Sequence, residues 1–373
     1  METLRILAFN WRDINHPQAG GAERLVHEFA RFADSRGHFV TLFAAKHPKA
    51  RSEQNVDGYS VVRKGNQFTV YWWARTLYGS RFHREHYDVI LESITGVPWC
   101  APLYAREPVI AMWLHVVGRT FFQELPLPFA VAGWLAEAAI PAIYRYTHLV
   151  ALTNLFRQQL IEKGLSKERV HVVPPGLDHN VYRLGENKSA TPSMIFVGPI
   201  KGYKHPEMAL NVLADLLPDI PNLRLHVIGW DRAGLAQSLA KRATRLGVQQ
   251  QVTFHGWIPD YLKAKLLQEA WVLLQPSERE GWSLAAMEAA ACGTPAVATA
   301  VGGLQESVRH RETGLLVPYG NRRAISSAAR AVLVDERLRK DLSVGAVQWA
   351  SGFTWERYAR ETLAVLTGTR SSF

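Results

Sequence analysis

The chain has 373 residues, 47% of them hydrophobic and 20% charged, which is the composition of a soluble globular protein long enough for two domains. Its net charge of +10 would suit nucleic acid, nucleotide diphosphates or anionic lipid alike. The sequence carries no helix-turn-helix, RNA-binding aromatic motif or zinc finger, so we expect no nucleic-acid partner.

The first half of the chain alternates strand-like and helix-like patterns. An apolar strand at residues 6–9 is followed by a loop and by a helix that ends at Gly37. That helix has one apolar face, made by Ala22, Leu25, Val26, Phe29 and Ala33. Further strands are expected at residues 39–45, 59–63, 89–91, 109–113, 149–152 and 170–173. Strands that alternate with helices predict a parallel, doubly wound sheet.

Two segments of this half are candidates for contact with a membrane. Residues 125–144 are apolar but contain Glu137 and three prolines, so we expect a buried or interfacial segment and not a spanning helix. Residues 68–84 interleave aromatic side chains with Arg75, Arg81 and Arg84 and contain no acid. This pattern is typical of a membrane interface, and it is equally typical of a buried helix whose arginines lie on its polar face.

The N-terminus and the cysteines both favour a cytoplasmic protein. The first five residues lead directly into the first strand, without the basic, apolar and small-residue pattern of a secretory signal. Cys100 and Cys292 are far apart and lie among apolar or small residues, so we expect two buried thiols and no disulfide.

The alternation restarts after a linker in the middle of the chain. Pro174, Pro175 and Gly176 open a polar stretch that extends to Pro192. Strands are then expected at residues 195–198, 225–229, 252–254, 272–275, 296–299 and 315–317. We therefore expect two similar α/β domains, residues 1–175 and 176–352, with ligands bound in a cleft between them.

Two strand ends in the first domain are candidate site positions. Gly20 and Gly21 open the first helix, where glycine permits close backbone approach to a ligand. A tight strand-to-helix turn explains the same pair equally well. His115 follows an apolar strand at the edge where doubly wound sheets bind ligands, although a lone histidine there is often structural.

The most informative motif joins a buried strand, residues 271–275, to a helix, residues 285–292. Between them, the junction from Glu280 to Leu284 presents backbone N–H groups without intrahelical partners, which suits a phosphate. The carboxylate of Glu280 cannot usefully bind that phosphate and would hold a hydroxyl-rich group beyond it. Glu288, about one helical turn further in, could reach a ribose diol.

This phrase resembles the retaining glycosyltransferases of family 4, enzymes with the two-domain GT-B architecture. The resemblance implies two doubly wound, Rossmann-like domains that face a central cleft, with residues 353–373 crossing back to the first domain. It implies that Glu280 holds the transferred sugar and that Glu288 binds the nucleoside ribose. Sugar and diphosphate would meet the backbone amides of Gly281, Trp282, Ser283 and Leu284.

The resemblance also assigns roles to residues outside the motif. Lys204 would neutralise the diphosphate as the sugar leaves, while Pro199 stands where the family carries an arginine. Lys201 could supply the second charge, with a reach that differs from that of an arginine. His115 would contact the sugar or the acceptor, and the loop with Gly20 and Gly21 would cover the diphosphate.

The nucleobase would bind at the loop that follows the strand at residues 252–254. Trp257 could stack on the base and the backbone at Ile258 could read the base edge, or Trp257 could pack against the next helix. The sequence has no Asp-x-Asp pair and no His/Cys cluster, so we expect neither a metal ion nor another cofactor.

Together these features predict a metal-independent, retaining hexosyltransferase. It would move a sugar from a nucleotide-diphosphate donor to a hydroxyl acceptor that is lipid-linked or a cell-envelope glycan precursor. We expect a cytoplasmic enzyme, peripheral on the inner face of the membrane. Two alternatives stay open: a catalytically silent sugar-nucleotide-binding protein, which Pro199 makes conceivable, and an epimerase or phosphorylase of the same architecture.

Overall fold

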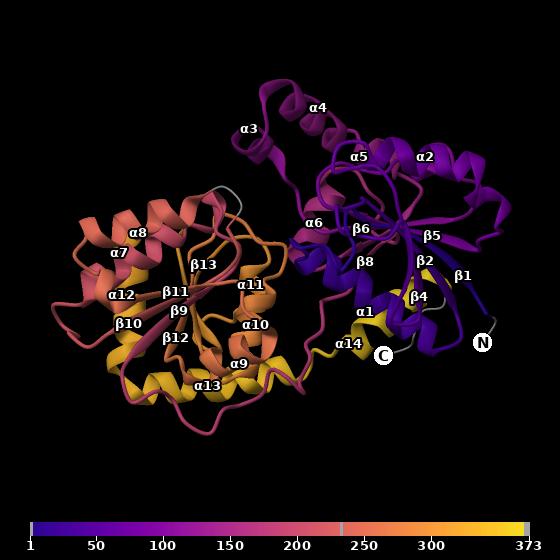
Figure 1. The fold of residues 1–373 in the computed structure, drawn as a ribbon. Helices are drawn as coiled ribbons and strands as arrows, with labels where there is room; N and C mark the ends of the chain where they lie inside the picture. The colour runs from indigo at the N-terminus through magenta and orange to yellow at the C-terminus, as the bar shows by residue number, and fades with distance from the viewer. Residues whose placement is uncertain (1–2, 232–233, 369–373) are drawn as a thin grey trace. The chain divides into compact units, whose positions relative to one another are not determined.

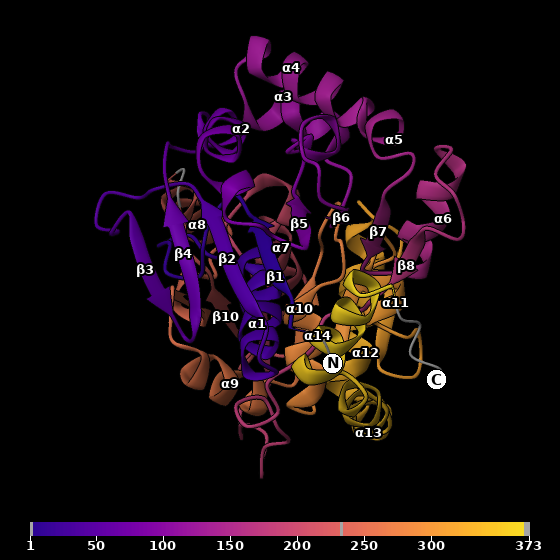
Figure 2. The same ribbon diagram turned by 90° about the vertical axis from the view of Figure 1, so that its right-hand side faces the viewer.

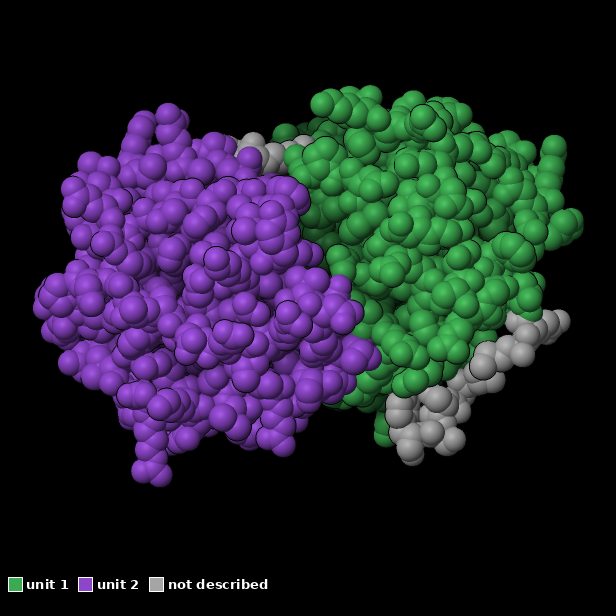
Figure 3. Space-filling model, turned by 60° about the horizontal axis from the view of Figure 1, so that its bottom comes forward, with its two compact units in different colours: residues 1–175, 355–373 green, residues 176–354 purple. Residues whose placement is uncertain are grey.

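The computed structural model describes residues 3–231 and 234–368, except for the side chains of residues 123 and 124. The chain forms two compact units (Figures 1 and 3). Met1–Pro175 and Trp355–Phe373 make up the N-terminal unit, and Gly176–Thr354 make up the C-terminal unit. Each unit is a sheet of predominantly parallel strands covered by helices, so the predicted fold class is confirmed.

The N-terminal sheet has the strand order β3-β4-β2-β1-β5-β6-β7-β8 within the described residues, and β3 alone in that sheet pairs antiparallel. Its strands are β1 (Arg5–Phe9), β2 (Phe39–Ala44), β3 (Glu53–Val56), β4 (Tyr59–Arg63), β5 (Val89–Ile94), β6 (Val109–Trp113), β7 (His148–Ala151) and β8 (Val170–Val172). From β1 the chain first adds β2, β4 and β3 on one side of the sheet, and then adds β5 to β8 on the other side. Ligands of doubly wound sheets bind at the carboxyl edge beside such a switch point.

Helices of the N-terminal unit are α1 (Gly21–Ser35), α2 (Val70–Ser80), α3 (Phe121–Glu124), α4 (Leu127–Ala138), α5 (Ile140–Ile143), α6 (Asn154–Glu162) and α14 (Trp355–Leu366). The predicted apolar face of α1 is confirmed, because Leu25, Val26 and Phe29 are buried. The C-terminal helix α14 packs on α1, as the resemblance implies. Figure 2 shows α2, α3 and α4 together beyond one end of the sheet.

The C-terminal sheet has the order β11-β10-β9-β12-β13-β14 in the described residues. Its strands are β9 (Ser193–Val197), β10 (Arg224–Ile228), β11 (Val252–Gly256), β12 (Val272–Gln275), β13 (Ala296–Thr299) and β14 (Gly314–Val317). Its helices are α7 (Pro206–Leu216), α8 (Leu235–Arg245), α9 (Asp260–Glu269), α10 (Leu284–Ala291), α11 (Leu304–Ser307), α12 (Arg322–Val334) and α13 (Glu336–Ser351), with a short 3-10 turn, η4 (Gly202–Lys204), before α7. The central strands β9, β12 and β13 are buried along their whole length. This burial on both faces explains why they are apolar runs and do not alternate.

The two apolar segments of the first domain fold as helices with distinct faces. Tyr78 of α2 is buried, whereas Trp72 of the same helix is exposed. Residues 68–84 are therefore neither a fully buried helix nor a wholly exposed interface segment. Among the described residues, no helix has both the length and the apolar character needed to span a membrane. Both cysteines are free thiols; Cys292 is buried, whereas Cys100 is only partly buried, contrary to the prediction.

Candidate functional site

The loop between β12 and α10 holds Glu280 in a fixed backbone setting. The carbonyl of Glu280 accepts a hydrogen bond of 2.8 Å from the amide of Gly303. A Cβ atom at Gly302 would lie 2.4 Å from that carbonyl oxygen, and one at Gly303 would lie 2.2 Å from the carbonyl oxygen of Gly281. Only glycines therefore allow the two backbones to approach so closely.

The side chain of Glu280 is held from one side. Its Oε1 forms an ion pair with Lys204 Nζ and accepts hydrogen bonds from Ser277 Oγ at 3.0 Å and Gln275 Nε2 at 3.1 Å. Within the described residues, Oε2 has no donor, so the carboxylate keeps one acceptor oxygen for a hydroxyl group.

Lys204 keeps its positive charge in this setting. Its residue is 8% exposed, and burial alone would lower the pKa of the ammonium group. The neighbouring Glu280 carboxylate more than offsets burial, so the pKa of Lys204 is raised above its ordinary value. Lys204 thus offers a buried positive charge at the end of η4, two residues before α7 begins.

Two further cations lie around the ring of Tyr203. The nearest is Arg279, whose guanidinium carbon is 4.6 Å from the ring centroid; Lys204 Nζ and Lys201 Nζ lie at 5.5 and 5.6 Å. Lys201 therefore stays a candidate for the second charge that the resemblance leaves open at Pro199. Arg279 was not among the predicted site residues, although it directly precedes Glu280.

The amides at the start of α10 remain open to an anion. Ser283 adopts a φ of 89° and caps the helix, its Oγ accepting a hydrogen bond from Ala286 N at 3.3 Å. Among the described residues, no acceptor faces the amides of Gly281, Trp282, Ser283 and Leu284. The Trp282 ring is buried 5.3 Å from the ring of Phe353, so Trp282 offers a ligand its backbone and not its side chain.

Glu288 is engaged by a lysine that the sequence did not suggest. Lys263 Nζ lies 3.0 Å from Glu288 Oε2 and 3.1 Å from Asp260 Oδ1. Burial would lower the pKa of Lys263, but its two carboxylate neighbours raise it overall. A ribose diol that binds Glu288 must share this carboxylate with Lys263.

The side chain of Trp257 is exposed and not packed against the next helix. It is 69% exposed and follows Gly256, whose φ is 64°. The side chain therefore does not pack against α9, and its ring is accessible for stacking on a planar group. Ile258 beside it is partly buried.

Replacing Glu288 by alanine should weaken nucleotide binding about 10-fold to 100-fold, because a hydrogen bond to a charged group contributes roughly 1.5–3 kcal/mol. The fold should persist, since Lys263 keeps Asp260 as a partner and alanine suits a helix. Titration calorimetry with nucleoside diphosphates measures this, with exposed Glu312→Ala as the matched control. Unchanged affinity would remove Glu288 from the site.

The remaining predicted residues, Gly20, Gly21 and His115, belong to the N-terminal unit. The Gly20 amide donates a hydrogen bond of 2.7 Å to Glu23 Oε2, so Gly20 caps α1 and does not offer that amide to a ligand. The role proposed for this turn therefore moves to the amide of Gly21. His115 is partly exposed after β6, and its carbonyl accepts a hydrogen bond of 3.0 Å from Trp113 Nε1.

The loop after His115 is held by a buried carboxylate. Glu137 of α4 is 5% exposed and accepts hydrogen bonds from the amides of Val117, at 2.6 Å, and Gly118, at 2.7 Å. Glu137 thereby fixes the backbone that follows His115.

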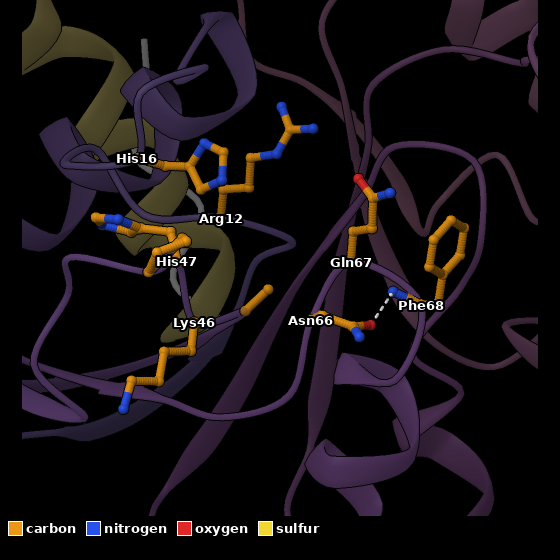
Figure 4. A pocket seen from close by; sticks show the side chains of 9 residues that line it. Arg12, His16, Lys46, His47, Asn66, Gln67 and Phe68 are labelled. Atoms are coloured by element: carbon orange, nitrogen blue, oxygen red, sulfur yellow. Dashed lines mark hydrogen bonds between the residues drawn. The ribbon is translucent and has the colours of Figure 1, made fainter.

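The N-terminal unit also contains a basic pocket that the sequence did not predict. It has a volume of about 250 Å³ and is formed by the loops that follow β1, β2 and β4, at the carboxyl edge of the sheet. Its lining consists of Arg12, His16, Ala45, Lys46, His47, Pro48, Asn66, Gln67 and Phe68. Figure 4 shows Arg12, His16 and His47 on one side and Gln67 and Phe68 on the other. Because this lining contains basic groups and no acid, the pocket suits an anion.

Comparison with known protein families gives two matches that together extend over most of the chain. Residues 19–181 match the family "Glycosyltransferase Family 4" and residues 184–349 match "Glycosyl transferases group 1". The first match covers most of the N-terminal unit and ends six residues into the C-terminal unit. The second match lies within the C-terminal unit.

Curated relatives carry the name D-inositol 3-phosphate glycosyltransferase. The relative from Geodermatophilus obscurus is 36% identical over 305 residues, covering 76% of this chain and 66% of the relative. The relative from Streptomyces bingchenggensis is 33% identical over 308 residues, covering 76% of this chain and 67% of the relative. The match covers only 57% of the relative from Thermomonospora curvata, so the chain spans about two thirds or less of these relatives' own length.

Solved structures share the fold over nearly the whole chain. Sucrose-phosphate synthase from Thermosynechococcus elongatus superposes with a TM-score of 0.84 at 20% identity, covering 98% of both chains. Anabaena HepE, crystallised with UDP-glucose, superposes with a TM-score of 0.76 at 17% identity, covering 98% of this chain and 100% of HepE. At such identities the likeness shows the fold alone.

Proposed function

The chain belongs to the family 4 glycosyltransferases, and from this premise we propose that it transfers a sugar from a nucleoside-diphosphate donor to a hydroxyl group of an acceptor. The observation that carries the proposal is the ion pair of the buried Lys204 with Glu280, beside the open amides of Gly281 to Leu284. A cation and four amides suit a diphosphate, and the open oxygen of Glu280 suits a sugar hydroxyl. The UDP-glucose in the HepE structure supports a donor of this class.

The chemistry that this site supports is stabilisation of a leaving diphosphate. As the bond from the sugar to the phosphate oxygen breaks, negative charge grows on the diphosphate next to Lys204 and the amides of α10. The acceptor oxygen forms its bond to the same sugar carbon, and its proton passes to the departing phosphate oxygen. Glu280 then positions the sugar: three donors hold its Oε1, and Oε2 accepts a hydrogen bond from a sugar hydroxyl.

Attack from the face that the diphosphate leaves would retain the configuration at the sugar carbon. We assign His115 to positioning the sugar or acceptor and the amide of Gly21 to the diphosphate. Trp257 and Ile258 would hold the base. Lys201, Lys204 and the amides would balance the diphosphate charge, so we also propose that transfer needs no metal ion and persists in a chelator.

The acceptor, we propose, carries a phosphate that binds in the basic pocket of Figure 4. The pocket lies at the carboxyl edge of the N-terminal sheet, where doubly wound domains bind ligands. The curated relatives are named for a phosphorylated inositol acceptor, which supports the same chemistry. A lipid-linked phosphate and a phosphorylated precursor of a cell-envelope glycan both meet this requirement.

The double variant Lys46→Gln, His47→Gln should raise the acceptor KM about 10-fold to 100-fold, since charge-assisted contacts to phosphate contribute roughly 1.5–3 kcal/mol. Inositol 3-phosphate is the first acceptor to try. Donor affinity should not change, because neither Lys46 nor His47 is among the residues assigned to the donor. Exposed Lys49→Gln is the control. If the double variant keeps the native acceptor KM, the acceptor phosphate does not bind in this pocket.

The proposed activity is tested by release of free nucleoside diphosphate from sugar nucleotides, with and without acceptor. A transferase releases the nucleoside diphosphate in proportion to the acceptor it glycosylates. Donor binding without release under any acceptor would favour the silent binding protein. A changed sugar without release would favour an epimerase, and release that requires inorganic phosphate would favour a phosphorylase.

A further inference from the structure

One face of the N-terminal unit exposes a concentration of large apolar side chains. It is formed by Phe68, just before α2, by Trp72 of α2, and by four residues of α4. We call this set the aromatic face; it consists of Phe68, Trp72, Leu127, Phe129, Trp134 and Leu135. Single exposed apolar residues are ordinary on protein surfaces, whereas a contiguous group marks an interaction site.

One ring contact joins the two parts of the aromatic face. The rings of Phe68 and Phe129 lie 5.7 Å apart, which joins the segment just before α2 to α4. Figure 2 shows both helices at the same end of the unit.

Helix α4 exposes its large apolar residues, whereas a helix that covers a core buries them. Its buried residues are Ala130, Gly133 and Glu137, which share one face at helical spacing. At Gly133 a Cβ atom would lie 2.8 Å from the Phe121 ring, so the contact admits no larger residue. The helix therefore buries Ala130, Gly133 and Glu137 and turns its large apolar residues outward; Leu127 is 68% exposed.

Among the described side chains of α2, α4 and the turn before α3, the exposed charges are basic. Arg75 lies one turn after Trp72 on α2, Arg119 lies just before α3, and both are exposed. Glu137, the acid of α4, is turned inward to the amides of Val117 and Gly118. An anionic surface therefore complements this face, whereas a second copy would bring like charges together.

Two residues suggested by the sequence do not contribute to the face. Arg81 is ion-paired with Glu53, at 2.5 Å, and with Glu85, at 2.7 Å. The Trp73 ring is covered by Lys64 Nζ, 3.7 Å from its centroid.

We propose that the aromatic face docks the N-terminal unit on an anionic lipid bilayer. Its aromatic and leucine side chains enter the boundary between head groups and acyl chains, while Arg75 and Arg119 lie at the head groups. Phe68 also lines the basic pocket, so docking brings the pocket to the bilayer surface. If the proposed function holds, a membrane-borne phosphorylated acceptor can then enter the pocket from the lipid.

The test is co-sedimentation of the full chain with vesicles of phosphatidylcholine alone or mixed with phosphatidylglycerol, without any nucleotide. Three proteins are compared: the native chain, an apolar variant Leu127→Gln, Trp134→Gln, and a charge variant Arg75→Gln, Arg119→Gln. The control is Val334→Gln, Val344→Gln, which removes exposed apolar residues of α12 and α13 outside the face. All of these side chains are exposed, so the melting temperature should stay the same.

The proposal predicts that the native chain and the control sediment with anionic vesicles and that both face variants bind at least tenfold more weakly. Each basic residue near an anionic surface changes binding about fivefold, and added salt should weaken it. Equal sedimentation of all proteins, or none, would overturn the proposal. Equal binding of the native chain to neutral vesicles would also overturn it, as would concentration-dependent self-association that only the face variants lose.

Because no donor is present in this assay, its outcome does not depend on the proposed transfer reaction. Nucleotide binding by the same preparations, measured without vesicles, tests the donor site separately.

Discussion

Replacing Lys204 by alanine should lower turnover about 100-fold to 1000-fold, the loss seen when one preorganised group that stabilises transition-state charge is removed. Lys204 is a buried cation in contact with Glu280, and its charge matters most as the diphosphate departs. Lys204, and not Lys201, forms the ion pair with Glu280, so Lys201→Ala should cost less. The measurement is kcat with saturating donor and acceptor.

Folding must be separated from catalysis in this comparison. Without Lys204, the Glu280 carboxylate keeps Ser277 and Gln275 as donors, so the fold should survive with a lower melting temperature. Lys241→Ala, an exposed lysine of α8, is the control. Equal losses from Lys201 and Lys204 would mean that both share the role of the missing family arginine. If neither Lys201→Ala nor Lys204→Ala lowers turnover, the loop that carries these two lysines is not part of the site.

Replacing Glu280 by glutamine should lower kcat/KM for the sugar nucleotide about 100-fold, because a charged hydrogen bond to the sugar is lost and the buried Lys204 loses its counter-ion. The shape of the side chain is nearly unchanged. Affinity for the nucleoside diphosphate without sugar should change much less, since Glu280 is assigned to the sugar. Comparing calorimetric titrations of the two ligands separates these effects.

The Glu280 assignment fails if both ligands lose affinity equally. In that case the carboxylate would act only by holding Lys204 in place for the diphosphate. It also fails if neither turnover nor affinity responds.

The central strands and the local site motif were predictable from the sequence because each depends on neighbouring residues. Buried runs such as β9 and β12 are apolar along their length, and the junction from Glu280 to Leu284 lies within one continuous strand–loop–helix segment. The edge strand β3 was not predicted, because Glu53–Val56 is largely polar and pairs only with β4.

The contacts that complete the site could not be predicted, because they join segments far apart in the chain. Lys263 reaches Glu288 from α9, and Gly302 and Gly303 support the backbone of Glu280 from beyond β13. Likewise, Arg81 has no acid within residues 68–84; its partners are Glu85, just beyond that window, and Glu53 of β3. A prediction based on composition within one window therefore counted Arg81 as a free cation.

The sequence also could not predict which side of α4 is exposed in the aromatic face. Residues 125–144 are apolar on nearly every side, so periodicity could not say which side of α4 faces the protein. Packing decides: Ala130, Gly133 and Glu137 face inward, and a Cβ atom at Gly133 would lie 2.8 Å from the Phe121 ring. The larger apolar residues are left outside.

The most direct test of the donor site is a thermal-shift titration of the whole chain with uridine, guanosine and adenosine diphosphates, for the native protein and for Glu288→Ala. A ligand at about 100 times its Kd stabilises the folded state by roughly 2.7 kcal/mol, which is readily seen as a higher Tm. The site described here predicts that at least one nucleotide raises the native Tm and that Glu288→Ala loses most of this shift at the same concentration. No shift with any of the three, or a full shift retained in Glu288→Ala, would contradict it.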